Sequence, residues 1–589
     1  MNPYKLLTAV AAVALCTDAM AQYNPTIDVE GTYKPEVIIQ ERVNFFPDRM
    51  RFGAMTSALE YDRDGVVTDF TPFGVPMPAT GWQTDPDYAP RRGCVGLKMG
   101  SWLDTRLHGC YQFVRTPDTR AGVYLNYNST SLWKPEVSPE TADTRRRRQQ
   151  GTIGLFLRHN VAGKGSLDAD VRYNVAWFNY YGYNPTPWTG DPVPGNYYDA
   201  PTQTVNDAAV RVMWTSTLQK PLRYYAGADI RYVGMRRAYA PEREYVVKGA
   251  REVTASPRLG IGWHFRGHSS LGIDFLADFV TYTGQRGAWT GGSAIDRPES
   301  YGRVSLTPYY GYAGDRFELR AGPRVDIMIN AGSTFNIAPD FRLNWHTRGF
   351  AATVEASGGT VLNTLANGRD VSLYTSPLVL SGRPVYSPFD GKVKLGFGPF
   401  AGFRGELWFG YRFANHQRTG GLYPAMLNGS LPYADFLQGM ADGYNSHGYS
   451  AGIRLAYNYG RYFSLSAGAT YQPQKGKNSY WNGWDLPKAT VDASLGVNPW
   501  KPLHLRLDYN LRACRSTAYM TQLQADGPWS VRNVRLDNIS DLGFHAAYDI
   551  LPGLSVSLDL ENLLNRHDEL LPDLPMPGLT ILGGVCYRF

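Results

Sequence analysis

Charged side chains alternate with apolar ones along residues 316–329. In an extended strand, alternate residues face opposite sides of the sheet, so the charged residues share one face. Such a face supports two kinds of chemistry. It binds a polar substrate, or its acids and bases pair with one another and with a neighbouring strand. The sequence leaves both interpretations open for Arg316, Glu318, Arg320, Arg324 and Asp326.

A second candidate site is a run of four arginines in a polar connection of the chain, Arg145, Arg146, Arg147 and Arg148. The planar guanidinium group forms paired hydrogen bonds with phosphates and carboxylates. The run therefore predicts a binding site for a phosphorylated or acidic ligand. The alternative interpretation is a solvated loop base.

The rest of the chain offers little for catalysis. The H-E-x-x-H pattern and the P-loop pattern do not occur, and the 10 histidines are scattered. Beyond residue 21, four cysteines remain, and none has the spacing of a zinc site: Cys94, Cys110, Cys514 and Cys586. We therefore expect no enzyme activity, no cofactor and no metal site.

Strands must position these residues, because period-two alternation recurs along the chain. It is clear in residues 448–460, 504–512, 541–550 and 553–562. If the charged face met lipid, each arginine near the bilayer midplane would cost about 2–4 kcal/mol. The charges must therefore face a wet lumen, and the apolar residues must face lipid.

Tight turns alternate with long polar connections, which is typical of outer-membrane barrels with short periplasmic turns and long extracellular loops. Turns used as strand limits predict about 22 strands, beginning for example near residues 94, 391 and 534. The predicted fold class is all-β, a transmembrane antiparallel outer-membrane β-barrel over residues 94–589. Its expected location is the cell outer membrane.

Both ends of the chain agree with an outer-membrane protein. Lys5, an apolar run through Leu15 and an A-x-A pattern at 19–21 predict a signal peptide over residues 1–21. At the other end, alternate apolar residues lead to Tyr587 and Phe589. The 40 tyrosines and 62 glycines suit a barrel with aromatic girdles. A net charge of +7 over 589 residues is too small to predict a nucleic-acid partner.

The most specific pattern lies near the C-terminus. An alternating strand runs into Asn-Leu-Leu-Asn at 562–565, and Pro-Gly at 577–578 precedes a strand that ends at Phe589. This pattern resembles the C-terminal end of TonB-dependent outer-membrane receptors. The resemblance implies an uptake barrel of about 22 strands. It also implies a barrel-closing role for Tyr587 and Phe589, which resemble the tag read by the assembly machinery. The style of the sequence resembles proteins of the Bacteroidota.

The chain departs from this family before the barrel, where the receptors carry a globular plug. Only residues 22–93 precede the first predicted strand, and their many prolines favour an irregular periplasmic or lumenal segment. Barrels of this size have plugged lumens. The lumen must therefore be closed by this segment, by a partner, or by inward-folded loops such as 359–390 and 415–446.

Two functions are compatible with these features. The first is transport or uptake across the outer membrane, with the lumen closed in one of these ways. The alternative is a non-transporting scaffold that anchors lipoproteins or an assembly or secretion complex. The expected partners are outer-membrane lipid, lipopolysaccharide (whose phosphates the arginine run would bind), the outer-membrane assembly machinery, and surface or periplasmic lipoproteins.

Three cysteines share the lumenal face in this register: Cys94, Cys110 and Cys586. The first strand of a closed barrel adjoins the last. Cys94 therefore faces Cys586 across the closure or Cys110 across the first hairpin, and the periplasm permits either disulfide. Either bond, or free thiols, remains open at this point.

Overall fold

The computed structural model describes the greater part of the predicted barrel. The described residues are 91–131, 146–179, 202–217, 220–236, 249–265, 268–283, 299–331, 335–371, 373, 384–415, 421–426, 432–437, 445–460, 462–476, 487–522, 529–569 and 575–589. The predicted signal peptide and almost all of the segment before the barrel lie outside them.

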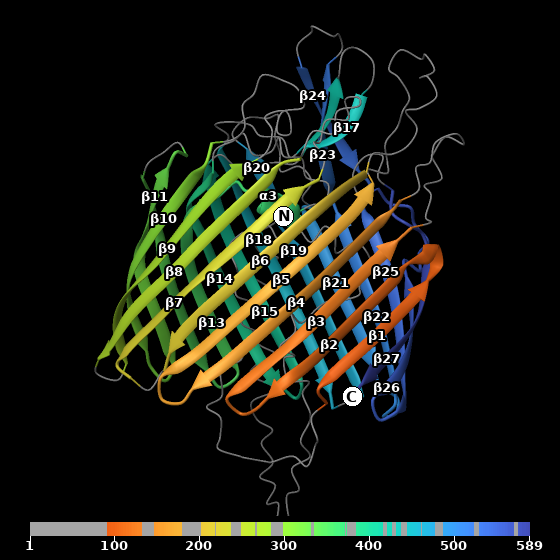
Figure 1. Ribbon diagram of the computed structural model, residues 1–589, viewed down its shortest axis with the longest axis horizontal. Helices are drawn as coiled ribbons and strands as arrows, with labels where there is room; N and C mark the ends of the chain where they lie inside the picture. Colours follow the sequence, from red (N-terminus) through yellow and green to blue (C-terminus); the bar gives the residue numbers. More distant parts are fainter. Residues whose placement is uncertain are drawn as a thin grey trace, which may run out of the picture. The chain divides into compact units, whose positions relative to one another are not determined.

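The described chain forms an antiparallel sheet that closes on itself (Figure 1). The sheet contains 23 strands, of which β20 is a three-residue strand that pairs with β18 beyond the end of β19. The closed ring therefore has 22 strands, and the predicted barrel and strand number are confirmed. The ring closes where β1 pairs with β27, from Cys94 opposite Arg588 to Gly100 opposite Leu582.

Most ring strands are 11 to 16 residues long, which suits strands that cross a bilayer at a tilt. Their bounds are β1 Gly93–Gly100, β2 Thr105–Arg115, β3 Thr119–Thr130, β4 Arg148–Val161, β5 Gly165–Asn179, β6 Thr202–Ser216, β7 Leu222–Met235, β8 Arg251–Phe265, β9 Ser269–Thr283, β10 Tyr301–Ala313, β11 Phe317–Ile329, β12 Phe335–Thr347, β13 Phe350–Val361, β14 Val385–Phe400, β15 Phe403–Asn415, β18 Asn445–Tyr459, β19 Phe463–Tyr471, β21 Ala489–Val497, β22 Leu503–Ala513, β25 Ile539–Leu551, β26 Leu554–Glu561 and β27 Thr580–Arg588, with β20 at Gln474–Gly476.

Short and long connections lie at opposite ends of the ring. The turn end carries tight turns such as 162–164 and 552–553, and the C-terminus lies there (Figure 1). The loop end carries the long connections. Two of these connections contribute a separate four-stranded sheet, made of β16 Gly421–Met426, β17 Pro432–Leu437, β23 Arg515–Gln522 and β24 Trp529–Leu536.

Helical structure is sparse among the described residues. A 3-10 helix at Ser101–Leu103 joins β1 to β2, and the helix α3, Leu365–Val371, lies between β13 and β14. Within the described part of the chain, no helix is long and apolar enough to cross a membrane.

The outer face of the ring is an apolar surface. In β8, Leu259, Ile261 and Trp263 are 50%, 49% and 56% exposed, and in β27 Ile581 and Val585 alternate with buried or half-buried residues in the same way. A closed ring satisfies its backbone hydrogen bonds internally, so an apolar outer band can face hydrocarbon. The chain is therefore an outer-membrane barrel, as the alternation predicted.

Two predicted strand boundaries are wrong by several residues. β14 begins at Val385 instead of near 391, so the predicted loop 359–390 is shorter. β25 begins at Ile539 instead of near 534, because residues 529–536 form β24 of the second sheet. Polar stretches that pair outside the membrane carry no lipid-facing pattern, so alternation gave no sign of them.

The orientation of the wall makes a direct prediction. Leu259→Arg places a charge on the lipid face midway along β8 and is expected to cost about 2–4 kcal/mol of folding free energy. Arg258→Leu is the matched control, because Arg258 faces inward and its partner Asp229 keeps a second ion pair with Arg211. Folding into lipid vesicles, followed by the heat-modifiable shift on gels, measures both. Equal folding yields would contradict the assigned faces.

Candidate functional site in the barrel lumen

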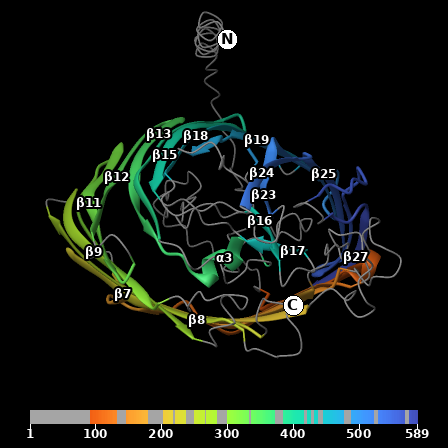
Figure 2. The ribbon, with the colours of Figure 1, turned by 90° about the horizontal axis from the view of Figure 1, so that it is seen from above.

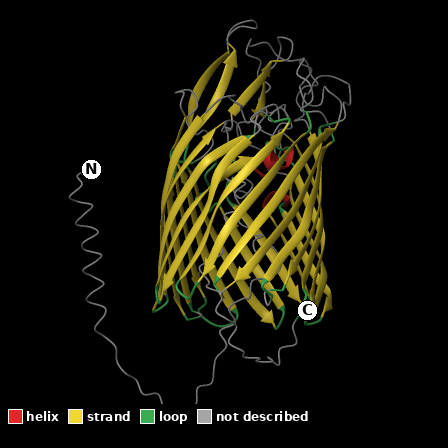
Figure 3. Cartoon of the chain, turned by 90° about the vertical axis from the view of Figure 1, so that its left-hand side faces the viewer, coloured by secondary structure: helices red, strands yellow, loops and turns green. Residues whose placement is uncertain are grey.

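The chain leaves the wall after β13 and turns inward, so that α3 lies inside the ring (Figures 2 and 3). We call residues 362–371 the lumenal segment. Its side chains Leu365 and Ala366 are 1% and 3% exposed and belong to a buried cluster with Val233 of β7 and Val280 of β9. The segment is thus packed against the inner wall by a small hydrophobic core of its own.

Local sequence and the wall together start the helix. The Thr364 hydroxyl accepts the Asn367 amide at 3.0 Å, which is the hydrogen bond of a helix N-cap. Glu252 of β8, only 1% exposed, accepts the amides of Leu365 at 2.5 Å and Ala366 at 3.0 Å. Amides in the first turn of a helix have no partner within it, so a wall carboxylate both caps α3 and fastens it.

An arginine fastens the other end of α3. Arg231 of β7 donates to Asp207 of β6 at 3.0 and 2.8 Å and to Asp370 of α3 at two distances of 2.8 Å. One guanidinium group therefore forms forked hydrogen bonds with a wall carboxylate and a helix carboxylate. Charged, paired hydrogen bonds of this kind are the strong ones.

Main-chain contacts hold the residues before α3. The carbonyl oxygen of Asn363 accepts the hydroxyl groups of Tyr282 at 3.0 Å and Tyr301 at 2.5 Å. The amide of Thr360 donates to Asp326 at 2.6 Å. Wall groups from β8, β9, β10 and β11 thus fix the path by which the chain enters the lumen, so the lumenal segment partly fills it.

The predicted charged face, which begins just before β11 and continues along it, divides into two groups. Arg316 and Glu318 are exposed near the turn end. Arg320 donates to Asp274 of β9 at 2.6 Å and to Asp340 of β12 at 2.8 Å. Arg320 therefore pairs with carboxylates on the adjacent strand β12 and on β9, which lies beyond β10.

The remaining two residues of that face lie beside the entry of the lumenal segment. Arg324 donates to Asp326 at 3.0 Å, and Asp326 is 1% exposed. Asp326 also accepts the Ser305 hydroxyl at 2.5 Å. The structure therefore places Arg324 and Asp326 together, at the entry of the segment.

The structure also separates the predicted arginine run. Arg145 lies outside the described residues. Arg146 is 4% exposed and lines a small cavity at the loop end, beside Asp104 and Asp568. The amide of Arg147 donates to Asn179 at 2.8 Å, and Arg148 begins β4.

Ionic contacts cross the closure of the ring. Arg106 of β2, 4% exposed, donates to Glu561 of β26 at 2.6 and 2.8 Å and to Asp104 at 3.2 and 2.9 Å. β1 and β27 lie between β2 and β26 in the ring. One buried guanidinium group therefore links the two strands that flank the closing pair.

Glycines make room for these crossing contacts. Lys98 of β1 reaches Asp559 of β26 at 2.5 Å, and a Cβ added to Gly584 of β27 would lie 2.6 Å from the Lys98 side chain. One row away, the His108 ring lies against Gly96 of β1, where an added Cβ would collide with it. The closing strands thus leave side-chain space that their neighbours fill.

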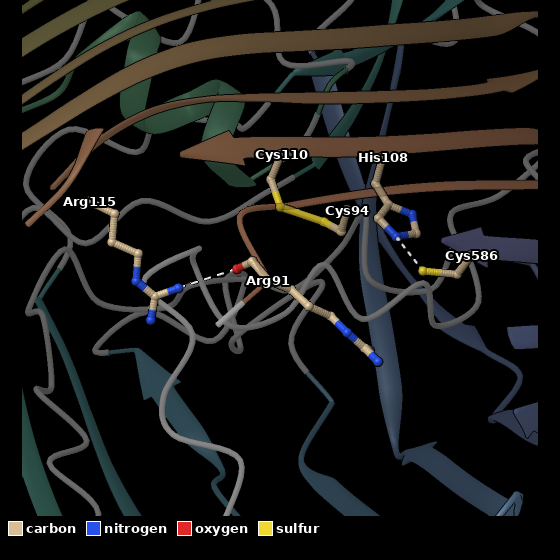
Figure 4. Close-up of a disulfide and its surroundings, with 6 residues drawn as sticks. All are labelled: Arg91, Cys94, His108, Cys110, Arg115 and Cys586. Atoms are coloured by element: carbon tan, nitrogen blue, oxygen red, sulfur yellow. Dashed lines mark hydrogen bonds between the residues drawn. A yellow bond between two sulfur atoms is a disulfide. The ribbon is translucent and has the colours of Figure 1, made fainter. Parts of the chain in front are cut away.

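Three of the cysteines, Cys94, Cys110 and Cys586, lie at this same closure (Figure 4). Cys94 and Cys110 face each other across the first hairpin and form a disulfide, one of the two bonds left open by the sequence. Cys586 has a free thiol 3.9 Å from His108 Nε2, and Cys514 is also free. The disulfide therefore fastens β1 to β2, and the pairing of β1 with β27 has no disulfide.

Tyr587 and Phe589 stand at the closing end of β27. The Phe589 amide donates to the Gly93 carbonyl at 2.9 Å, and its own carbonyl accepts the amides of Arg92 at 2.6 Å and Gly93 at 2.8 Å. Its ring stacks on Tyr587 at 5.6 Å and on Tyr111 at 6.1 Å between centroids. These contacts hold the C-terminus against β1 and β2.

The described residues contain no group of three or more potential ligands placed to hold a metal ion. One catalytic-looking pattern, G-x-S-x-G, does occur at 448–452. It lies in the middle of β18, whereas a nucleophilic serine elbow requires a turn between a strand and a helix. The pattern therefore gives no support to catalysis at Ser450.

Sequence reasoning missed the residues that hold the lumenal segment. Glu252 and Asp207 lie on wall strands separated from α3 by more than a hundred residues. The one local sign of a helix start was Thr364 followed by Leu-Ala, because threonine is a preferred N-cap residue.

Comparisons with known proteins identify solved structures of similar architecture. Neither a protein-family model nor a curated protein sequence matches the chain. Among solved structures, the FrpB iron transporter of Neisseria meningitidis matches with a TM-score of 0.61 and 10% identity, over 85% of this chain and 81% of FrpB. The siderophore receptor PirA of Acinetobacter baumannii gives 0.59 and 11%, over 85% and 80%.

A third structure agrees. The pyoverdine outer membrane receptor FpvA of Pseudomonas aeruginosa gives a TM-score of 0.58 and 11% identity, over 85% of this chain and 78% of FpvA. At such low identity the similarity shows the fold alone. This chain therefore has the closed 22-strand barrel fold of TonB-dependent outer-membrane receptors, as the C-terminal pattern predicted.

Proposed function

We propose that this protein transports a ligand across the outer membrane. The observation that carries the proposal is a closed 22-strand ring with a segment of its own chain fastened inside the lumen. A barrel this wide cannot be filled by its wall side chains, which suffice only near eight strands. Similar barrel folds occur in an iron transporter and in a siderophore receptor, which supports uptake as the class of function.

We further propose that residues 22–93 complete the closure of the lumen. The lumenal segment, residues 362–371, is short, so it narrows a ring of this size without filling it. The preceding segment combines many prolines with aromatic residues, including Phe45, Phe46, Phe70 and Trp82. Disordered linkers are poor in aromatics, so this composition supports packing against the barrel.

Single-channel conductance tests the proposal. A variant that lacks residues 24–90 and keeps residues 1–23 should insert into planar bilayers and conduct several-fold more than the full chain. The same cells should become sensitive to large antibiotics. The matched control deletes the same residues and supplies them as a separate polypeptide, which should lower conductance again.

An unchanged conductance in a correctly inserted deletion variant would contradict closure by this segment. Combining the deletion with Glu252→Gln and Asp370→Asn, which loosen α3, then tests closure by the lumenal segment. If that barrel also conducts no ions, the transport proposal fails and a blocked scaffold is favoured.

One observation favours the alternative scaffold function. The sheet of β16, β17, β23 and β24 belongs to two long connections and is separate from the ring. A folded sheet at the loop end would offer a docking surface to lipoproteins or to an assembly or secretion complex. Purification from native membranes separates the two functions: a TonB-type partner or a surface lipoprotein receptor argues for uptake, and an assembly or secretion factor argues for the scaffold.

A further inference from the structure

Arg369 of α3 is a buried arginine whose partners do not account for its charge. Its side chain is 6% exposed, inside the lumen. Neither its Nε nor its Nη1 forms a hydrogen bond to any part of the chain that the structure describes. A buried guanidinium group with unsatisfied donors is costly, and in proteins such a group is normally paired.

The nearest carboxylate is already in use. Asp207 lies 4.0 Å from Arg369 Nη1, which is beyond a hydrogen bond. Both of its oxygens accept hydrogen bonds from Arg231, which also holds Asp370. The carboxylates of Asp207 and Asp370 thus form their hydrogen bonds with Arg231. Arg369 is left with a long ionic contact to Asp207.

The strand register adds positive charge on the same stretch of wall. Ala209 of β6 stands between Arg172 of β5 and Arg231 of β7 in one row of the sheet. Val210 beside it is exposed on the lipid face, so Ala209 and this row face inward. Asp207, on the same inner face of β6, interacts electrostatically with both Arg172 and Arg369, so the two arginines face the same part of the lumen.

Arg369 remains a cation in this setting. Burial lowers the pKa of Arg369 to about 10, because the charged group loses hydration. The guanidinium group is therefore protonated at neutral pH. A buried charge that keeps its proton gains most from a partner of opposite charge.

We propose that Arg369 and Arg172 form a lumenal binding site for a small anion, through a carboxylate or phosphate group. Arginine forks match the geometry of both groups. The site deepens the proposed function, because it assigns an anionic group to the transported ligand. The binding test uses only the purified barrel and does not depend on transport.

Isothermal titration calorimetry on the full-length protein in lipid-free detergent tests the site. The probes are inorganic phosphate and citrate, with chloride at equal ionic strength as the reference. Phosphate, citrate or both should bind, and Arg369→Gln should weaken binding about ten- to a hundredfold, the effect of a charged hydrogen bond. Citrate alone would assign a carboxylate ligand, and phosphate alone a phosphate ligand.

Two further variants keep the test decisive. Arg316→Gln removes an exposed arginine at the turn end and should bind as tightly as the unaltered protein. If Arg369→Gln does not fold, Arg172→Gln takes its place as the variant that removes a predicted anion contact. The proposal is overturned if neither anion binds, or if the folded lumenal variant binds as tightly as Arg316→Gln. Calorimetry measures binding and not transport. A failure of the conductance test would therefore leave the binding result unchanged.

Discussion

Deletion of Phe589 should reduce the amount of folded barrel in the outer membrane several-fold. The residue supplies three main-chain hydrogen bonds to residues 92 and 93 and stacks on two tyrosines. At about 1 kcal/mol for each hydrogen bond and about 1 kcal/mol for the aromatic contacts, the loss is on the order of 4 kcal/mol. A change of that size is a large part of the stability of a typical protein.

Membrane fractionation with heat-modifiable gel migration measures the effect. Phe589→Tyr keeps the main-chain bonds and the stacked ring, so it should assemble normally. Phe589→Ala keeps the main-chain bonds alone and should fall between the two. Normal membrane levels of the deletion variant would refute the barrel-closing role of Phe589.

Replacement of Arg106 should destabilise the closure about as strongly. Arg106→Met leaves the carboxylates of Asp104 and Glu561 buried without their cation. Breaking a buried ion pair from one side costs about 3–5 kcal/mol, because an uncompensated charge remains. Denaturant unfolding of the barrel in vesicles measures this cost, and adding Glu561→Gln and Asp104→Asn to Arg106→Met should recover part of it.

The matched control is Arg211→Met. Arg211 also lies on the inner wall and pairs with a carboxylate, Asp229, but its side chain is 59% exposed and Asp229 keeps Arg258. An exposed pair contributes about 0–1 kcal/mol. If the two replacements cost the same, the argument from burial at the closure is wrong.

The wall of the barrel could be predicted because lipid imposes a pattern on each strand separately. Leu259 and Arg258 must face opposite ways whatever the neighbouring strands do. The starts of most strands followed from such local contrasts, as in β1 at Gly93 and β26 at Leu554. The C-terminal residues at 562–565 and Phe589 added a local pattern typical of receptors with this fold.

The interior could not be predicted in the same way. Glu252, Arg231 and Asp326 look like any other inward polar residue of a wet wall, and only the fold shows that they hold residues 360–370. The five charged residues from Arg316 to Asp326 shared one face in sequence, yet distance along the chain separates Arg316, just before β11, from Asp326. Alternation along a strand shows which face of the sheet a side chain occupies, but it does not show which residue that side chain pairs with.

Gly584, at the closure, has a consequence for the alignment of the last strand of the ring. A slip of β27 by two residues would leave every side chain on its proper face, so the hydrophobic pattern could not detect the error. Such a slip would bring Leu582 or Cys586 opposite Lys98 in place of Gly584, fill the space through which Lys98 reaches Asp559, and break that ion pair. The space at Gly584 therefore favours the observed alignment of the final strand over one that is shifted by two residues.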